Sequence, residues 1–188
     1  ALGTELAKKG VGGTDVHTAR TGMADAAYPG DEACLDAIIE WLSYLPRNCR
    51  RDPPAAEPRP PERDPDRLVD VIPADPKKGY DVHDVLAGVV DAGSVLELKP
   101  RYARNVVTAL ARVEGSPVGV IANAPTTLAG TIDTDASEKA ARFASLCDAF
   151  GPPLLLFEDT PGVLPGPDSE LSPIPISRCR RHAVMRAS

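Results

Sequence analysis

The sequence has few aromatic residues and no long apolar run. Aromatic residues make up 4% of the 188 residues, whereas charged residues make up 26%. A membrane-spanning helix needs about 20 predominantly apolar residues, but the longest apolar run, residues 152–157, has only the length of a strand. The first residues also lack the basic-then-apolar order of an export signal. We therefore expect a globular protein without a membrane partner, located in the cytoplasm.

Basic residues are outnumbered, and the cysteines are not spaced for a metal. Lys and Arg total 21 against 27 Asp and Glu, which gives a formal net charge of −6. No basic stripe is interleaved with aromatic residues, so nucleic acid is not an expected partner. None of the four cysteines forms a Cys-x-x-Cys pair, so no metal site is expected. Cys34 and Cys147 fall in helical patterns and are predicted to be reduced core residues.

Proline divides the chain into segments. Residues 46–76 contain nine of the 20 prolines: Pro46, Pro53, Pro54, Pro58, Pro60, Pro61, Pro65, Pro73 and Pro76. Proline fixes φ, and such a stretch buries too little apolar area to offset its ordering entropy, so it predicts a solvated, semi-rigid linker. We expect residues 46–70 to pack poorly and to lack regular structure. The expected organisation is 1–45, the linker 46–76, a second unit 77–170, and a tail 171–188.

Apolar periodicity predicts a helix before the linker and another after it. The first has one apolar face, with Asp31 as N-cap and Pro46 as the stop: Leu35, Ile38, Ile39, Leu42 and Leu45. In the second unit, Asp81 is expected to cap a helix with a similar inner face: Val82, Val85, Leu86 and Val89.

The rest of the second unit alternates strands and a helix. Strands are predicted over 95–98, 106–113 and 117–122, the last two joined at the turn residues Glu114, Gly115 and Ser116. Asp135 and Glu138 are arranged like a capping box that opens a helix over 136–150, with its buried face at Ala140, Phe143, Cys147 and Phe150. The apolar run 153–157 predicts a strand covered on both faces. The order is strand, strand, helix, strand.

An ordered set of short motifs carries a family resemblance. Gly-Gly-Thr-Asp-Val-His (12–17) precedes Thr-Gly-Met-Ala-Asp (21–25), and the second unit contains the further motifs Gly79–Val82, Tyr102–Val107, Lys139–Phe143 and Asp159–Gly166. Over roughly residues 10–170 the set resembles the carboxyltransferase (beta) subunit of biotin-dependent acyl-CoA carboxylases of the propionyl-/acetyl-CoA type. The resemblance ends after Glu170, and we expect the sequence to be a fragment.

The resemblance implies a fold and a set of partners. The fold would be α/β, a partial crotonase-like ββα spiral. Residues 1–45 would end the carboxyltransferase N-domain, and 77–170 would form the first half of the C-domain. The implied partners are a biotin carboxylase and biotin carboxyl carrier subunit, and further copies in a hexamer. Carboxybiotin and acyl-CoA would be substrates, with no cofactor bound covalently.

The resemblance also implies how the reaction is catalysed. Carboxyl transfer to the α-carbon of an acyl-CoA would proceed through an enolate that backbone N–H groups stabilise in oxyanion holes. The Gly-rich segments that form these holes are expected upstream of Ala1 and downstream of Ser188. We therefore expect no catalytic residue within these 188 residues, and no activity from the chain alone.

What remains are candidate walls of the acyl-CoA and biotin cleft. The candidates are Gly12, Gly13, His17, Asn123, Pro125, Gly130, Asp159, Pro161, Gly162, Pro165 and Gly166. Each has a structural alternative. His17 can be a packed residue that fixes a loop, and Asn123 can cap a turn through its side chain. Residues 159–166 can be a rigid strand-to-helix turn.

Three alternative functions stay open beside carboxyl transfer. A decarboxylase of the same fold would run the chemistry from a malonyl-type thioester. A non-catalytic truncated remnant would bind without turnover. An enoyl-CoA hydratase of the crotonase superfamily is disfavoured by the Pro-rich linker and by the loop 159–166.

Overall fold

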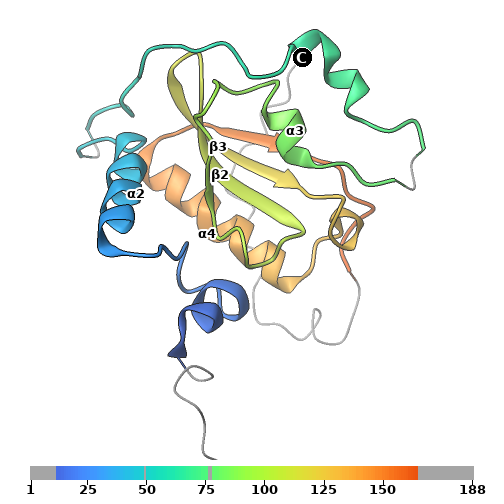
Figure 1. Cartoon of the computed structure of the whole chain (residues 1–188), viewed down its shortest axis with the longest axis horizontal. Coiled ribbons are helices and arrows are strands. Elements are labelled where there is room, and N and C mark those ends of the chain that lie inside the picture. Colours follow the sequence, from blue (N-terminus) through green and yellow to red (C-terminus); the bar gives the residue numbers. More distant parts are fainter. Residues whose placement is uncertain (1–11, 49, 76–77, 165–188) are drawn as a thin grey trace, which may run out of the picture.

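The computed structural model describes residues 12–48, 50–75 and 78–164 (Figure 1). Its elements follow in the order η1 (Val16–Arg20, a π-helix), α2 (Asp31–Ser43), η2 (Pro65–Asp70), α3 (Val82–Leu86), β1 (Leu96–Leu98), β2 (Val106–Val113), β3 (Ser116–Asn123), η3 (Leu128–Gly130), α4 (Thr134–Phe150) and β4 (Leu154–Phe157). Within the described ranges, no helix is long and apolar enough to cross a membrane.

A four-stranded mixed sheet forms the centre, in the order β1-β2-β3-β4. β1, β2 and β3 are antiparallel neighbours, and β4 runs parallel to β3 after the α4 crossover. The β2–β3 turn has positive φ at Glu114 (49°) and Gly115 (78°), as a two-residue hairpin with the twist of its strands requires. The predicted order of strand, strand, helix, strand is therefore confirmed.

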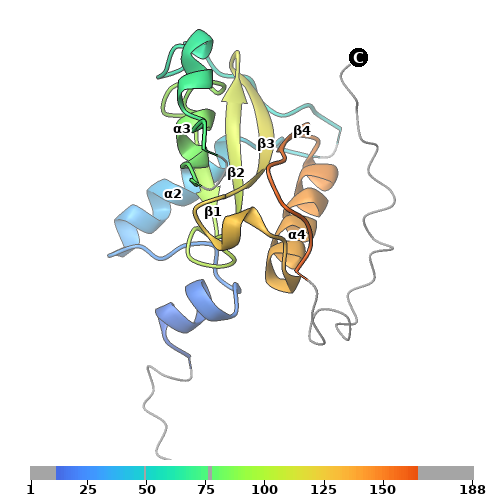
Figure 2. The same cartoon turned by 90° about the vertical axis from the view of Figure 1, so that its right-hand side faces the viewer.

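Helices cover both faces of the sheet (Figure 2). On one face, Val82, Leu86 and Val90 pack with alternate residues of β2 and β3, such as Ala109 and Val120. On the other face, Phe143 and Cys147 of α4 pack with Leu110 and Tyr44. Alternate side chains of β2 thus contribute to both hydrophobic clusters, one on each face of the sheet. As predicted, Asp81 caps α3 by accepting a hydrogen bond from the His83 amide.

Most of the predicted apolar face of α2 is not buried, although Leu45, just beyond the helix, is buried. Leu35, Ile38, Ile39 and Leu42 are exposed, and Cys34 is exposed with them. Within the described residues the helix is attached through its C-terminal end, where Tyr44 Oη donates to the Ser94 carbonyl at 2.6 Å. The helix is correctly located, but Gly30 rather than Asp31 is the N-cap.

α4 begins two residues earlier than predicted. Its N-cap is Asp133, whose carboxylate accepts from the Ala136 amide at 2.8 Å, so Asp135 lies in the first turn instead of forming a capping box with Glu138. Phe143 and Cys147 are buried as expected, whereas Ala140 is half-buried and Phe150 is 38% exposed at the end of the helix. The helix ends at Gly151, which adopts the left-handed conformation.

The Pro-rich linker is solvated but not loose. Most side chains over 51–60 are exposed, and the predicted lack of regular structure is interrupted by η2. Its backbone is anchored to the second unit by the Ala56 amide on the Gly115 carbonyl and the Arg63 amide on the Ala87 carbonyl, both at 2.9 Å. The prediction that the linker packs poorly is therefore wrong for its backbone.

β4 is less covered than its apolar sequence predicts. It is the outer strand of the sheet in the described residues, and Leu156 is 61% exposed. Leu154 and Leu155 pack on opposite clusters, so both faces are contacted, but neither is sealed. The predicted divergent tail, 171–188, lies outside the described residues.

Candidate functional site at the carboxyl ends of β3 and β4

Three strand ends meet at one edge of the sheet. β3 ends at Asn123, whose partner across the antiparallel ladder is Val106, the first residue of β2. β4 runs parallel to β3, so its carboxyl end and Asp159 follow at the same edge. In open α/β sheets the carboxyl ends of strands are the usual ligand side. The predicted cleft residues from Asn123 onward should therefore converge at this edge.

Asn123 joins two loops at this edge. Its side chain is largely buried (7% exposed). Its Nδ2 donates to the Gly130 carbonyl at 2.9 Å, and its Oδ1 accepts from the Asp159 amide at 3.3 Å. Both bonds go to backbone, as the turn-fixing alternative predicted.

The segment before Gly130 is strained. Leu128, Ala129 and Gly130 have φ of 49°, 52° and 71° in succession, a region that costs a non-glycine residue about 1–2 kcal/mol. A Cβ atom at position 130 would lie 2.6 Å from the Asp159 carbonyl oxygen. Glycine is therefore needed for the close approach of these two loops, and strain of this kind often accumulates at functional sites.

The loop after β4 is held by Tyr80 and by residue 132. Tyr80 Oη donates to the Asp159 carboxylate at 2.8 Å. Burial, together with this hydrogen bond, raises the pKa of Tyr80 to about 12. The Ile132 amide donates to the Gly162 carbonyl at 3.0 Å, and the Leu164 amide donates to the Ile132 carbonyl at 2.8 Å. Pro161 lies within the loop that these hydrogen bonds hold.

Pro125 lies beside the segment that carries Tyr80. A Cβ atom on Gly79 would be 3.0 Å from the Pro125 carbonyl oxygen. The structure therefore brings together Asn123, Pro125, Gly130, Asp159 and Gly162. Pro165 and Gly166 lie outside the described residues.

The N-terminal candidates form a separate group. The amides of Val16 and His17 donate to the Gly13 carbonyl at 3.0 and 3.3 Å, and a Cβ atom on Gly12 would be 3.9 Å from His17 Nε2. His17 lies in the π-helix η1, an uncommon element that is frequent at functional sites. Its Nδ1 is buried and has no hydrogen-bond partner among the described residues. This segment contacts the second unit through Lys99, Arg101 and Tyr102.

Two residues that the sequence analysis passed over organise the same edge. Asn105 Nδ2 donates to the Thr131 carbonyl at 2.7 Å, and the Ala124 amide donates to the Asn105 carbonyl at 2.9 Å. Lys139 is buried, and its Nζ donates to backbone carbonyls of residues 99–106. The position of Lys139 four residues before Phe143 placed it on the buried helix face, which was the available signal.

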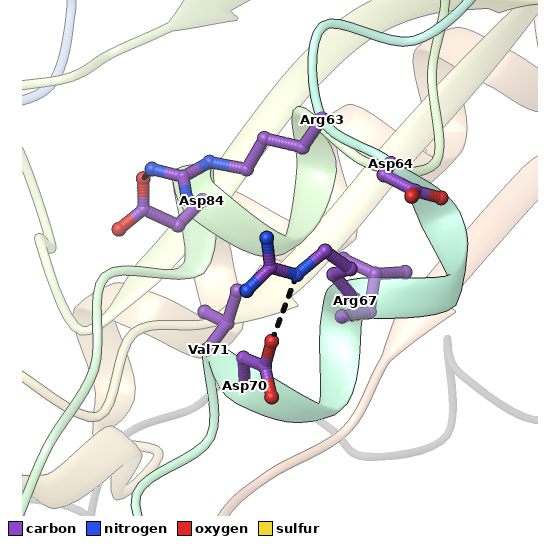
Figure 3. Close-up of a pocket in the computed structure, with 7 residues that line it drawn as sticks. Arg63, Asp64, Arg67, Asp70, Val71 and Asp84 are labelled. Atoms are coloured by element: carbon purple, nitrogen blue, oxygen red, sulfur yellow. Dashed lines mark hydrogen bonds and ion pairs between the residues drawn. The ribbon is translucent and has the colours of Figure 1, made fainter.

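A cavity in the described residues lies away from this edge. About 560 Å³ opens between η2 and α3, lined by Arg63, Asp64, Arg67, Leu68, Asp70, Val71 and Asp84 (Figure 3). Arg63 is paired with Asp84, and Arg67 with Asp70. These side chains are about half exposed or more, so the groove is a solvated set of surface ion pairs. None of the predicted cleft residues lines it. Over the described ranges, no cluster of three or more His, Cys, Asp or Glu side chains could hold a metal ion.

Comparison with known proteins identifies the family. The chain matches the carboxyl transferase domain family over residues 1–174. The chain belongs to this family. It is 46% identical over 169 residues to the propionyl-CoA carboxylase carboxyltransferase subunit of Haloferax mediterranei, covering 89% of this chain and 33% of that protein. It is 41% identical over 180 residues to the acetyl-/propionyl-CoA carboxylase beta5 subunit of Mycobacterium tuberculosis, covering 92% and 33%.

Solved structures of carboxyltransferases share the fold. A structure of transcarboxylase 12S, described as a hexamer with hydrolysed methylmalonyl-CoA bound, aligns with a TM-score of 0.86 at 40% identity, over 94% of this chain and 35% of that one. A single-chain long-chain acyl-CoA carboxylase aligns with a TM-score of 0.74 at 36% identity, over 88% and 16%. The predicted α/β, crotonase-like architecture is confirmed for the part of the carboxyltransferase that this chain covers. The chain spans about a third of the length of the curated relatives it matches.

Proposed function

We propose that this chain contributes to a carboxyltransferase that moves a carboxyl group from carboxybiotin to the α-carbon of a short-chain acyl-CoA, propionyl-CoA or acetyl-CoA. The observation that carries the proposal is the match at 46% identity to a propionyl-CoA carboxylase carboxyltransferase subunit over 89% of this chain. The biotin-dependent relative from Mycobacterium tuberculosis supports the same substrates.

In the proposed reaction, carboxybiotin releases CO2 and the biotin ureido group takes the α-proton of the acyl-CoA, so that charge develops on the thioester oxygen. The resulting enolate attacks the CO2 through its α-carbon. Backbone N–H groups aimed at that oxygen stabilise an enolate, and each such donor typically contributes about 2.7–4 kcal/mol. The described residues would supply the cleft walls. Asn123 and Gly130 fix the turn beside β3, and Tyr80 and Asp159 fix the loop beside β4. None of these side chains takes a covalent step in the proposal.

The proposed partners follow from the same chemistry. Carboxybiotin arrives on a biotin carboxyl carrier subunit that a biotin carboxylase charges, and copies of the carboxyltransferase assemble as a hexamer. The relatives named as biotin-dependent and the hexamer named for transcarboxylase 12S support this assignment. We also propose the division into an N-domain end, a linker and a C-domain first half, and a cytoplasmic location.

A decarboxylase is the second candidate. The methylmalonyl-CoA decarboxylase alpha subunit of Veillonella parvula is 38% identical over 169 residues, covering 89% of this chain and 33% of that protein. It uses the same family fold, so identity over these residues does not by itself separate the two directions.

A graft tests the proposal. Residues 12–164 replace the matching segment of the Haloferax mediterranei subunit, and the hybrid is purified with its carboxylase and carrier partners. Formation of methylmalonyl-CoA from propionyl-CoA, or of malonyl-CoA from acetyl-CoA, supports carboxyl transfer. Loss of methylmalonyl-CoA without net carboxylation favours the decarboxylase. A correctly assembled hybrid inactive in both directions contradicts the proposal and favours a non-catalytic remnant.

A further inference from the structure

Lys139 is a buried lysine whose amine is used entirely by backbone. Its side chain is 2% exposed. Nζ donates to the carbonyls of Val106 at 2.7 Å, Lys99 and Tyr102 at 2.9 Å, and Ala103 at 3.4 Å. An ammonium has three protons and no acceptor, so these carbonyls occupy its full donor capacity. Among the ion pairs of the described residues, none includes Lys139.

Three of the four carbonyls belong to the loop between β1 and β2, and the fourth belongs to Val106, the first residue of β2. The loop is strained. Lys99 and Ala103 have φ of 56° and 44°, the left-handed region that side chains disfavour. Such a conformation persists only when its surroundings impose it. Charge-assisted hydrogen bonds are the strong ones among protein hydrogen bonds, and the ammonium from α4 makes several of them to this loop.

The same loop holds the N-terminal segment that carries His17. Lys99 Nζ pairs with Asp25 at 2.8 Å and also donates to the Gly22 carbonyl. Arg101 Nη1 contacts Asp15 at 2.9 Å and Thr18 Oγ1 at 3.2 Å. The Tyr102 ring lies so close to Gly22 that a Cβ atom there would be 2.5 Å from the ring.

At its other end, the loop holds the strand edge that carries Asn123. Asn105 donates to the Thr131 carbonyl and to the Asp133 carboxylate at 2.7 and 3.2 Å, and its own carbonyl accepts from the Ala124 amide. Residues 99–106 therefore contact both segments that carry predicted cleft residues.

We propose that Lys139 is a positioning residue that holds the loop 99–106 in the strained conformation by which it sets the His17 segment relative to the Asn123 edge. The proposal rests on the proposed function only in taking these two groups as walls of one cleft. Lys139 itself contacts loop carbonyls and acts on the site through them.

Hydrogen exchange on the 188-residue chain tests directly whether Lys139 holds the loop 99–106, an interaction called the Lys139 clamp below. Lys139→Met keeps most of the length and the apolar stem while removing the ammonium. We expect amide exchange over 15–25 and 99–106 to rise at least about tenfold relative to the β2–β3 hairpin. Phe143→Leu is the matched control, because it lies on the same buried helix face but does not bond the loop. Phe143→Leu is expected to raise amide exchange no more in those two segments than elsewhere in the chain. The same pattern of exchange in both variants would overturn the proposal.

Amine labelling tests the clamp without any substitution. The side chain of Lys78 is exposed, whereas that of Lys139 is buried under the loop. An acylating reagent is expected to modify Lys139 at least about 100-fold more slowly than Lys78 in the folded chain. Equal rates would overturn the proposal even if Lys139→Met failed to fold.

Kinetics in the graft test the link to function. Lys139→Met is expected to lower kcat/KM for the acyl-CoA at least tenfold in a hybrid that still assembles, and Lys139→Arg is expected to recover part of that loss. Phe143→Leu is expected to stay within about twofold of the unsubstituted graft. A Lys139→Met hybrid within twofold would overturn the positioning role. An inactive unsubstituted graft would contradict the proposed function, and the exchange and labelling results would then still decide the clamp.

Discussion

Replacing Asn123 by Asp should destabilise the chain in a pH-dependent way. The substitution removes the Nδ2 donor from the Gly130 carbonyl, a buried bond of 2.9 Å, while the Asp159 amide can still bond the remaining oxygen. A carboxylate oxygen would then face a carbonyl oxygen in a site only 7% exposed. Leaving a buried group unsatisfied costs about 1–3 kcal/mol, and more when it is charged. For a chain of this size, that corresponds to a fall in Tm of about 2–12 °C.

The sign of the pH dependence follows from the same geometry. The protonated acid can donate to the Gly130 carbonyl, so the folded state favours protonation and raises the pKa of the new carboxyl group. Its stabilising contribution is therefore present below the ordinary pKa of Asp, near 3.9, and is lost as pH rises through the folded-state value. Relative to the unsubstituted chain, Asn123→Asp should recover as pH falls.

Urea unfolding followed by circular dichroism at several pH values measures this difference. Asn48→Asp is the matched control, because Asn48 is exposed and its Oδ1 accepts from the Arg50 amide at 3.0 Å, which a carboxylate does equally well. The control is expected to stay within about 0.5 kcal/mol. The reasoning is refuted if Asn123→Asp behaves like Asn48→Asp at pH 7, or if its deficit does not change with pH.

Three further predictions follow from single contacts. Gly130→Ala should destabilise the folded chain by more than the roughly 1 kcal/mol cost of a left-handed alanine, since its Cβ would lie 2.6 Å from the Asp159 carbonyl oxygen. A Tm at or above that of the unsubstituted chain would refute this. Asp91→Ala should lose about 1.5–3 kcal/mol, because the carboxylate accepts from the amides of Glu114 and Gly115 at 2.9 and 2.7 Å; denaturant titration measures it, and a loss below 0.5 kcal/mol would contradict it. The hydrogen bond to Glu97, with that to Asp81, raises the pKa of His83 from 6.5 to about 9. The contribution of His83 to folding stability is therefore complete below pH 6.5 and is lost as pH rises through 9. His83→Gln should flatten the dependence of stability on pH between these values, and an unchanged dependence would count against the pairing.

Local signals predicted the elements well. The turn at Glu114 and Gly115, the cap at Asp81 and the strand after α4 each depend on a few neighbouring residues. The N-cap of α4 was misplaced because Asp133, Asp135 and Glu138 offer competing carboxylates, and only the structure shows which one meets the Ala136 amide.

Long-range contacts limited the prediction of burial. The apolar side of α2 has the periodicity of a buried face, yet Ile39 is 66% exposed, since periodicity shows which side is apolar and not what covers it. The linker was predicted to pack poorly because its composition gives no sign of the Asp91 and Gly115 groups that bond its backbone.

The sequence singled out candidate site residues but not the contacts that join them. Asn123, Gly130 and Asp159 were singled out separately, and the structure joins them through one amide side chain. Lys139 was missed as a contributor, because a lysine in a helix is ordinarily exposed, and its carbonyl partners lie 33 to 40 residues away in sequence.

The rate of methylmalonyl-CoA formation by the graft of residues 12–164 tests the central claim most directly. With saturating propionyl-CoA and carboxylated carrier, we predict a rate within about tenfold of the intact Haloferax mediterranei subunit. That margin is smaller than the 10²–10³ lost with a single oxyanion-hole donor. A hybrid that assembles like the relative but is slower by more than 10³ would contradict the assignment of these residues to a carboxyltransferase cleft.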